Sequence, residues 1–291
     1  MLDDAPFRIL IPLDGTLQSQ HALPYAQALA TAQTKLILLE VLPDPEPERG
    51  LRGNITTSAE AVGQRRSGAT TAALETVAER VRLGASGADV DVAVVVGGSA
   101  DRILKAAREM QIDLIVMATY SRSQIGRLVL GSVTDRIVKA ATVPVLVVRP
   151  HDVTANQSSV LVQRLVVPLD GSRTASSALP ITERLALLTG LPVHLVTVAS
   201  DEQSEARYHT KRPYTTLVEH GVRVSTETLV GRPVTAIEQA THPGDLIVMA
   251  SHHRAGLTAW LLHGVAERLI SHGRCPVLLT PDVSHTATRT A

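Results

Sequence analysis

The sequence predicts an α/β protein built from two tandem copies of one parallel-sheet domain. Short runs rich in Val, Leu and Ile alternate with stretches that carry apolar residues at helical spacing, the pattern of a parallel sheet covered on both faces. Four sequence blocks also recur in the same order, which indicates a duplication. PLDG at 12–15 recurs at 168–171, ALP at 22–24 recurs at 178–180, DLIVMA at 113–118 recurs at 245–250, and PVL at 144–146 recurs at 276–278.

The first copy is expected to alternate between strand and helix from end to end. We expect strands at residues 7–13, 35–42, 90–96, 113–118 and 143–149, and helices at 17–33, 58–83, 99–110 and from Gly131 through Lys139. Ser99 is expected to cap the third helix, with Asp101 and Arg102 in its first turn. The stretch at 43–57 is polar and punctuated by Pro and Gly, which predicts a mobile surface loop.

The second copy is shorter than the first. Matched blocks are offset by 156 residues early in the copies and by 132 residues late, because the second copy lacks most of the 43–57 loop and part of the helix after it. We therefore expect a first domain at 1–150, a polar linker at 151–163, a second domain at 164–281 and a polar tail at 282–291. The last apolar strand of each copy should lie at a sheet edge, where the strands at 143–149 and 275–280 can pair and form an intrachain pseudo-dimer.

Composition and charge limit the classes of partner. Lys plus Arg and Asp plus Glu both total 28, and only 2% of residues are aromatic, which argues against a nucleic-acid-binding protein. No apolar run approaches the ~18 residues of a membrane span, and the acidic N-terminus does not fit a signal peptide. The single Cys275, expected to be a buried small hydrophobic residue, fits a reducing compartment, so we expect a cytoplasmic protein without a membrane partner.

The segment after the fourth strand has the pattern of an anion site. The apolar strand leads into a polar loop and then into Gly131-Ser132, which opens a helix. The unpaired N–H groups and the dipole of a helix start favour a negatively charged ligand. The same residues also fit a simple cap, with Ser132 as N-cap and Asp135 three residues later. Asp14 and Asp170 likewise fit turn residues that bind their own backbone.

Taken together, these blocks make the chain similar to a universal stress protein of the tandem, two-domain type. The resemblance covers residues 6–150 and 163–281, and it depends on PLDG with the following ALP helix, DLIVMA, LGSV at 130–133 and the closing VPVLVVR. It implies two doubly wound α/β domains of the adenine-nucleotide α-hydrolase-like class, each with a five-stranded parallel sheet. It also implies dimerisation through the last strand, within the chain and also between chains.

Some universal stress proteins bind ATP through a motif of three glycines. Two residues separate the first glycine from the second, nine residues separate the second from the third, and the third is followed by Ser or Thr. The matching positions in the first copy are Ala118, Ser121, Gly131 and Ser132, so only the last pair matches. Ser121 adds a side chain where the backbone must approach phosphate closely, although its hydroxyl can donate to a phosphate oxygen.

The resemblance further implies that Asp14 contacts the ribose and that the backbone of Val41 meets adenine. The implied cofactor is ATP, with or without Mg²⁺. The implied binding residues are Pro12, Asp14, Val41, Ala118, Ser121, Gly131, Ser132 and Val133.

The second copy departs further from the ATP motif. Its matching positions are Ala250, His253, His263 and Gly264, so imidazole bulk replaces a glycine and the hydroxyl is lost. Asp170 remains, but we expect nucleotide mainly in the first domain. We expect His252, His253 and His263 on the surface rather than around a metal ion.

No catalytic motif accompanies these residues in the sequence: Gly-x-Ser-x-Gly, GxxxxGK[ST] and a GxGxxG after the first strand are all missing. We therefore expect no enzyme beyond, at most, a slow ATPase. The favoured function is a stress-response regulatory module that binds adenine nucleotide in its first domain, with the 43–57 loop as a lid. The alternative, favoured by Ser121, His253 and His263, is a universal stress protein without nucleotide that acts as a protein-interaction module.

Overall fold

The computed structural model describes residues 5–49, 55–119, 130–149, 162–199, 208–250 and 264–281. The chain forms two compact units, Met1–Met117 and Ala118–Ala291. Most of the expected linker and the whole of the expected tail lie outside the described residues. Within the described ranges, no helix is both long enough and apolar enough to cross a bilayer.

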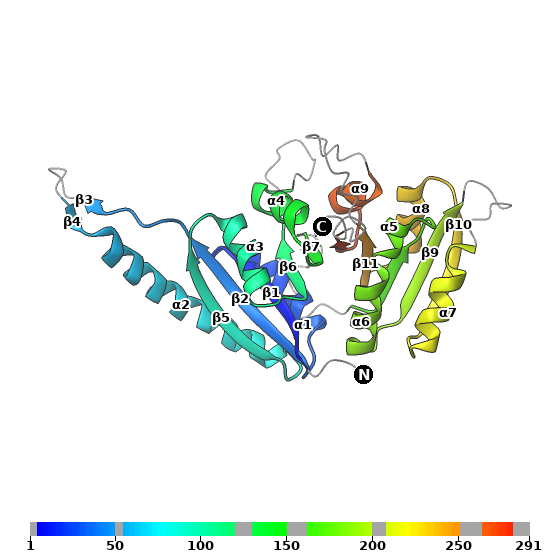
Figure 1. Ribbon diagram of the computed structural model, residues 1–291, viewed down its shortest axis with the longest axis horizontal. Helices are drawn as coiled ribbons and strands as arrows, with labels where there is room; N and C mark the ends of the chain where they lie inside the picture. The colour runs from blue at the N-terminus through cyan, green and yellow to red at the C-terminus, as the bar shows by residue number, and fades with distance from the viewer. Residues whose placement is uncertain are drawn as a thin grey trace, which may run out of the picture. The chain divides into compact units, whose positions relative to one another are not determined.

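The first unit contains a parallel sheet with the strand order β6-β1-β2-β5 (Figure 1). Its strands are β1 (Phe7–Leu13), β2 (Thr34–Leu42), β5 (Asp89–Val96) and β6 (Leu114–Ala118). The chain runs outward from β1 through β2 to β5 and then returns to β6 on the other side of β1. Ligands of doubly wound sheets bind at the carboxyl ends of the strands where the order reverses in this way.

Helices cover both faces of this sheet. They are the 3-10 helix η1 (Ser19–Ala22), α1 (Leu23–Ala28), α2 (Ala59–Gly84) and α3 (Ser99–Glu109). From β1 the chain crosses through α1 to β2 and through α2 to β5, in one direction along the sheet, and then crosses back through α3 to β6. Because connections between parallel strands are right-handed, α3 lies on the face opposite α1 and α2 (Figure 1). Central strand residues such as Ile9, Leu36 and Leu114 are therefore completely buried.

Two details of the helix predictions for this unit were wrong: the extent of the helix expected at 17–33 and the N-cap of α3. The helix expected at 17–33 is helical only over η1 and α1, because a side-chain turn ends it: the Thr31 N–H donates to Thr34 Oγ1 at 3.0 Å, and the Thr34 N–H donates to the Thr31 carbonyl at 2.9 Å. The N-cap of α3 is Gly98 rather than Ser99, which is already the first helical residue. By contrast, Ser58 does cap α2, since its Oγ accepts the Ala61 N–H at 3.3 Å.

The described residues of the 43–57 stretch, expected to be a mobile surface loop, form an arm that contains two short strands. Within this arm, β3 (Glu48–Arg49) pairs antiparallel with β4 (Ile55–Thr57), and Glu48 forms an ion pair with Arg65 on α2. Figure 1 shows this ribbon at the far end of α2, away from β1 and β2. The described part of the arm thus does not cover the carboxyl ends of the sheet as a closed lid would.

The second unit contains a sheet with the strand order β10-β9-β8-β11-β12-β7. Its strands are β7 (Val145–Val148), β8 (Arg164–Pro168), β9 (Val193–Ala199), β10 (Val224–Val230), β11 (Asp245–Ala250) and β12 (Val277–Thr280). Its helices are α4 (Ser132–Ala140), α5 (Arg173–Ser176), α6 (Leu179–Thr189), α7 (Lys211–Glu219), α8 (Pro233–Ala240) and α9 (Val265–His272). The second copy therefore supplies the expected five parallel strands, β8 to β12.

The last strands of the two copies pair, as the sequence predicts. β7 runs antiparallel to β12, with Leu146 opposite Leu278. Directly after β7, the buried guanidinium of Arg149 donates to the carbonyl oxygens of Ile270 in the last turn of α9 and of Gly273 and Cys275 just beyond this helix. These contacts explain why the last strand of the first copy belongs to the second compact unit. Cys275 is buried, as expected.

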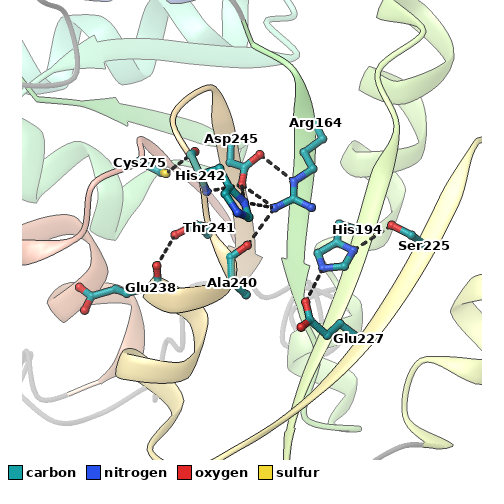
Figure 2. A network of polar contacts seen from close by, with 10 residues as sticks. All are labelled: Arg164, His194, Ser225, Glu227, Glu238, Ala240, Thr241, His242, Asp245 and Cys275. Atoms are coloured by element: carbon teal, nitrogen blue, oxygen red, sulfur yellow. Dashed lines mark hydrogen bonds and ion pairs between the residues drawn. The ribbon is translucent and has the colours of Figure 1, made fainter.

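An Arg–Asp pair marks the amino end of the sheet in each copy. In the second copy, the Arg164 guanidinium binds both carboxylate oxygens of Asp245 at 2.7 and 2.9 Å (Figure 2). In the first copy, the backbone N–H of Arg8 donates to the Asp113 carboxylate at 2.8 Å. Because these pairs lie at the strand ends opposite the carboxyl edge, we assign them to fold stability.

Candidate functional site

Asp14 occupies a fixed turn at the carboxyl end of β1. Its Oδ1 accepts hydrogen bonds from the N–H of Thr16 at 3.0 Å and from Thr16 Oγ1 at 2.6 Å, and its own N–H donates to Ser19 Oγ at 3.3 Å. Gly15 completes the turn with φ of +75°, a conformation that favours glycine. Burial acts to raise the pKa of Asp14, but hydrogen bonds from Thr16 and Ser19 outweigh it and hold this pKa below its ordinary value.

The turn interpretation of Asp14 is therefore confirmed, and it recurs in the second copy. There, Asp170 Oδ1 accepts the N–H of Ser172 at 2.9 Å, and Gly171 has φ of +80°. The same geometry leaves carboxylate acceptor capacity at the strand end, where acidic residues of nucleotide-binding folds meet ribose hydroxyls. Turn and binding roles are thus compatible at Asp14.

The other expected residues of the first unit lie at the same strand ends. Pro12 pairs with Leu39 in the β1–β2 register, and Val41 pairs with Val95 in the β2–β5 register. β2 continues one residue past Val41, and the Leu42 carbonyl accepts the Gly97 N–H at 2.9 Å. The peptide groups around Val41 are thus held in place by the sheet on the β5 side.

The expected phosphate residues lie at the start of α4 in the second unit. Gly131 is the N-cap, with φ of −57° and ψ of 151°, and Ser132 and Val133 are the first two helical residues. Among the residues that the structure describes, no side chain caps this helix, so the Ser132–Asp135 capping box is wrong; Asp135 instead forms an ion pair with Lys139 at 2.6 Å. The first-turn N–H groups of α4 are consequently not used by a side-chain cap from the described residues.

The remaining motif positions divide between described and undescribed residues. Ala118 ends β6, and the following Thr119 N–H donates to the Val148 carbonyl of β7 at 2.8 Å. Ser121, His252, His253 and His263 lie outside the described residues.

The second copy differs from the first beside the Asp170 turn. A Cβ atom placed on Gly171 would lie only 2.7 Å from the imidazole ring of His209, so this ring packs directly on the turn. On the other side, Gly264 is the N-cap of α9 and again has no side-chain cap bond. The second copy thus keeps the aspartate turn and the open helix start, but it places an imidazole against the turn.

Sequence analysis missed three residues that matter here: Glu40, Arg149 and His209. Glu40 carried a signal, because it is the one charged residue in the apolar run 36–42. His209 gave none, since its contact with Gly171 joins segments 38 residues apart in the chain.

The family model described as the Universal stress protein family matches residues 7–149 and 162–281. The chain belongs to the universal stress protein family. Its two matched segments agree with the two copies read from the sequence, so the tandem prediction is confirmed. The α/β fold class is confirmed as well.

Known relatives resemble this universal stress protein over one or both copies. Universal stress protein MJ0577 of Methanocaldococcus jannaschii is 28% identical over 153 residues, which cover 49% of this chain and 94% of that one. Universal stress protein Rv2005c of Mycobacterium tuberculosis is 26% identical over 184 residues, or 58% of this chain and 62% of that one. The crystal structure of a universal stress protein from Archaeoglobus fulgidus covers 94% of this chain and 98% of its own at 20% identity with a TM-score of 0.72, which supports the fold.

Proposed function

We propose that this universal stress protein is a stress-response regulatory module that binds an adenine nucleotide, ATP in particular, in its first copy. The observation that carries the proposal is the start of α4. Gly131 opens this helix without a side-chain cap, and Ser132 follows with its hydroxyl, so N–H groups and a hydroxyl donor remain for a phosphate. Membership of the family supports the adenine part of the proposal.

The proposed roles follow the chemistry of each residue. The N–H groups of Gly131, Ser132 and Val133 bind phosphate oxygens, and Asp14 accepts hydrogen bonds from the ribose. The peptide groups at Val41 meet the adenine edge. Mg²⁺, where present, is carried by the nucleotide phosphates, since this ion keeps most of its waters and binds phosphate oxygens readily.

We further propose that the second copy does not hold a nucleotide. His209 packs against Gly171 at the place that corresponds to Gly15, beside the ribose aspartate of the first copy. The expected stoichiometry is one nucleotide per chain. The module releases its nucleotide unchanged or hydrolyses it slowly, and the readout of binding is a change in affinity for a protein partner.

Gly131→Asp is expected to weaken Mg-ATP binding by about 100-fold or more, because a carboxylate replaces the phosphate at the helix start and repels it. Asp is also a preferred N-cap residue, so α4 should still form. Isothermal titration calorimetry on the full chain measures the change. The matched control is Gly264→Asp at the start of α9, where a Cβ meets nothing within 4 Å and binding should stay unchanged.

Absence of any heat with wild-type protein, or equal affinities for wild type and Gly131→Asp, would contradict the proposal. A second candidate function is then favoured: a protein-interaction module without nucleotide. The arm supports it, because only the first copy carries this insertion and its Ile55 side chain is 58% exposed. Under that function, Gly131→Asp leaves the cellular stress phenotype intact.

A further inference from the structure

Glu40 is a carboxylate that the fold of the first unit does not explain. It lies near the end of β2, opposite Leu13 in the β1–β2 register. A Cβ atom on Gly15 would lie 3.6 Å from Glu40 Oε1, so the glutamate reaches the turn that holds Asp14. Among the residues that the structure describes, none donates a hydrogen bond to Glu40 or forms an ion pair with it.

The surroundings of Glu40 disfavour its charged form. Burial raises the pKa of Glu40, and the nearby charge of Asp14 raises it further. A half-buried acid without a donor costs free energy of folding. Other strand acids of this unit do not bear this cost: Asp89 and Asp91 both pair with Lys35, at 3.0 and 2.6 Å.

The second copy shows that the fold does not need an acid at this position. Ile9 and Leu165 occupy the same position in the two copies, 156 residues apart. Leu36 lies opposite Ile9, and Val193 lies opposite Leu165, so Leu36 corresponds to Val193. Four residues further along each strand, Glu40 therefore corresponds to Thr197. Thr197 is buried, and its hydroxyl donates to the Leu169 carbonyl at 2.5 Å. The second copy therefore satisfies this position internally, whereas the first copy leaves an acceptor facing the aspartate turn.

We propose that Glu40 is a specificity-determining residue that, together with Asp14, selects adenine 5′-nucleotides whose ribose 2′- and 3′-hydroxyls are both free. This inference rests on the proposed nucleotide site. Ionised carboxylates only accept hydrogen bonds, and a ribose diol offers two O–H donors to the two acids. An ester at the 3′ oxygen removes one donor and brings a phosphate charge toward both carboxylates. The disfavoured class is thus 3′,5′-cyclic and 3′-phosphorylated adenine nucleotides.

The test compares AMP with 3′,5′-cyclic AMP, which share the base and one phosphate, by calorimetry on the full chain. Wild-type protein should prefer AMP by tenfold or more. Glu40→Gln should weaken AMP binding by about tenfold, the loss of one charge-assisted hydrogen bond, and leave cyclic AMP within about twofold. Glu79→Gln, an exposed glutamate of α2 in the same unit, is the matched control and should keep the wild-type preference.

The outcomes separate this inference from the proposed function. If neither nucleotide binds to wild-type protein, the nucleotide site itself is refuted and the role of Glu40 is refuted with it. If AMP binds well but Glu40→Gln keeps the same preference over cyclic AMP, only the role of Glu40 is overturned. Equal wild-type affinities for the two nucleotides would overturn it as well.

The stability of ligand-free Glu40→Gln distinguishes a glutamate that serves binding from one that supports the fold. The two roles predict changes of opposite sign in the urea midpoint. The pKa of Glu40 is higher in the folded chain than in the unfolded chain. The folded state therefore loses stability as the pH rises from the pKa of the unfolded chain through the pKa of the folded chain. Glu40→Gln removes this loss, so the ligand-free variant should have the higher urea midpoint at pH 7 and a smaller difference from wild type at pH 4. A lower midpoint at pH 7 would show that Glu40 supports the fold.

Discussion

Replacing Asp245 with Ala is expected to lower the free energy of unfolding of the second unit by about 3–5 kcal/mol. The Asp245 side chain is only 3% exposed, and it accepts two hydrogen bonds from the Arg164 guanidinium and one from the His242 backbone N–H at 2.7 Å (Figure 2). Its removal leaves the Arg164 charge, on a side chain 25% exposed, without its hydrogen-bonded counter-ion at the amino end of β8. Urea unfolding of the full chain, followed by circular dichroism, measures the loss.

A double replacement tests whether the unpaired charge causes this loss. Arg164→Met combined with Asp245→Leu removes both charges and should recover most of the stability, because buried ion pairs replaced by apolar groups are often neutral. Asp89→Ala is the surface control: Asp89 is 64% exposed, and its partner Lys35 keeps Asp91, so the cost should stay below about 1 kcal/mol. An Asp245→Ala cost as small as that of the control would show that the pair adds little to stability.

The strands of the fold could be predicted because each one is a local signal. β1 was expected at 7–13 and is found at Phe7–Leu13, since a strand buried on both faces is apolar over most of its length, and here only Arg8 near its amino end is charged. The helix at 17–33 could not be placed in the same way. Its composition suits a helix, but the hydroxyls of Thr31 and Thr34 give the backbone a competing turn.

For a similar reason, only part of the candidate site could be predicted from the sequence. Asp14, Gly131 and Ser132 stand in short motifs whose local geometry follows from strand ends and helix starts, and the structure places them there. The partners that modify the site come from distant segments. Glu40 meets Gly15 across 25 residues of chain, and no periodicity in the sequence shows that this acid has no donor among the described residues.

Arg149→Met is expected to destabilise the second unit by about 3–4 kcal/mol, the second-largest effect. The Arg149 side chain is buried, and its guanidinium reaches the carbonyl of Cys275 at 3.1 Å, that of Ile270 at 3.4 Å and that of Gly273. A positive charge at the carboxyl end of α9 also interacts favourably with the helix dipole. Methionine keeps the volume but leaves these buried carbonyl oxygens without their donor.

The position of Arg149 determines which segments should lose stability in Arg149→Met. Arg149 belongs to the first copy by sequence, yet its hydrogen bonds hold the segment between α9 and β12 of the second copy, where β12 pairs with β7. Hydrogen exchange should therefore accelerate at the end of α9 and in β12 but stay unchanged in β1. Arg149→Lys should restore only part of the stability, because an ammonium cannot reproduce the planar fork, and the exposed Arg108→Met should have no effect. Uniformly faster exchange in both units would mean that Arg149 is not a local clamp between the copies.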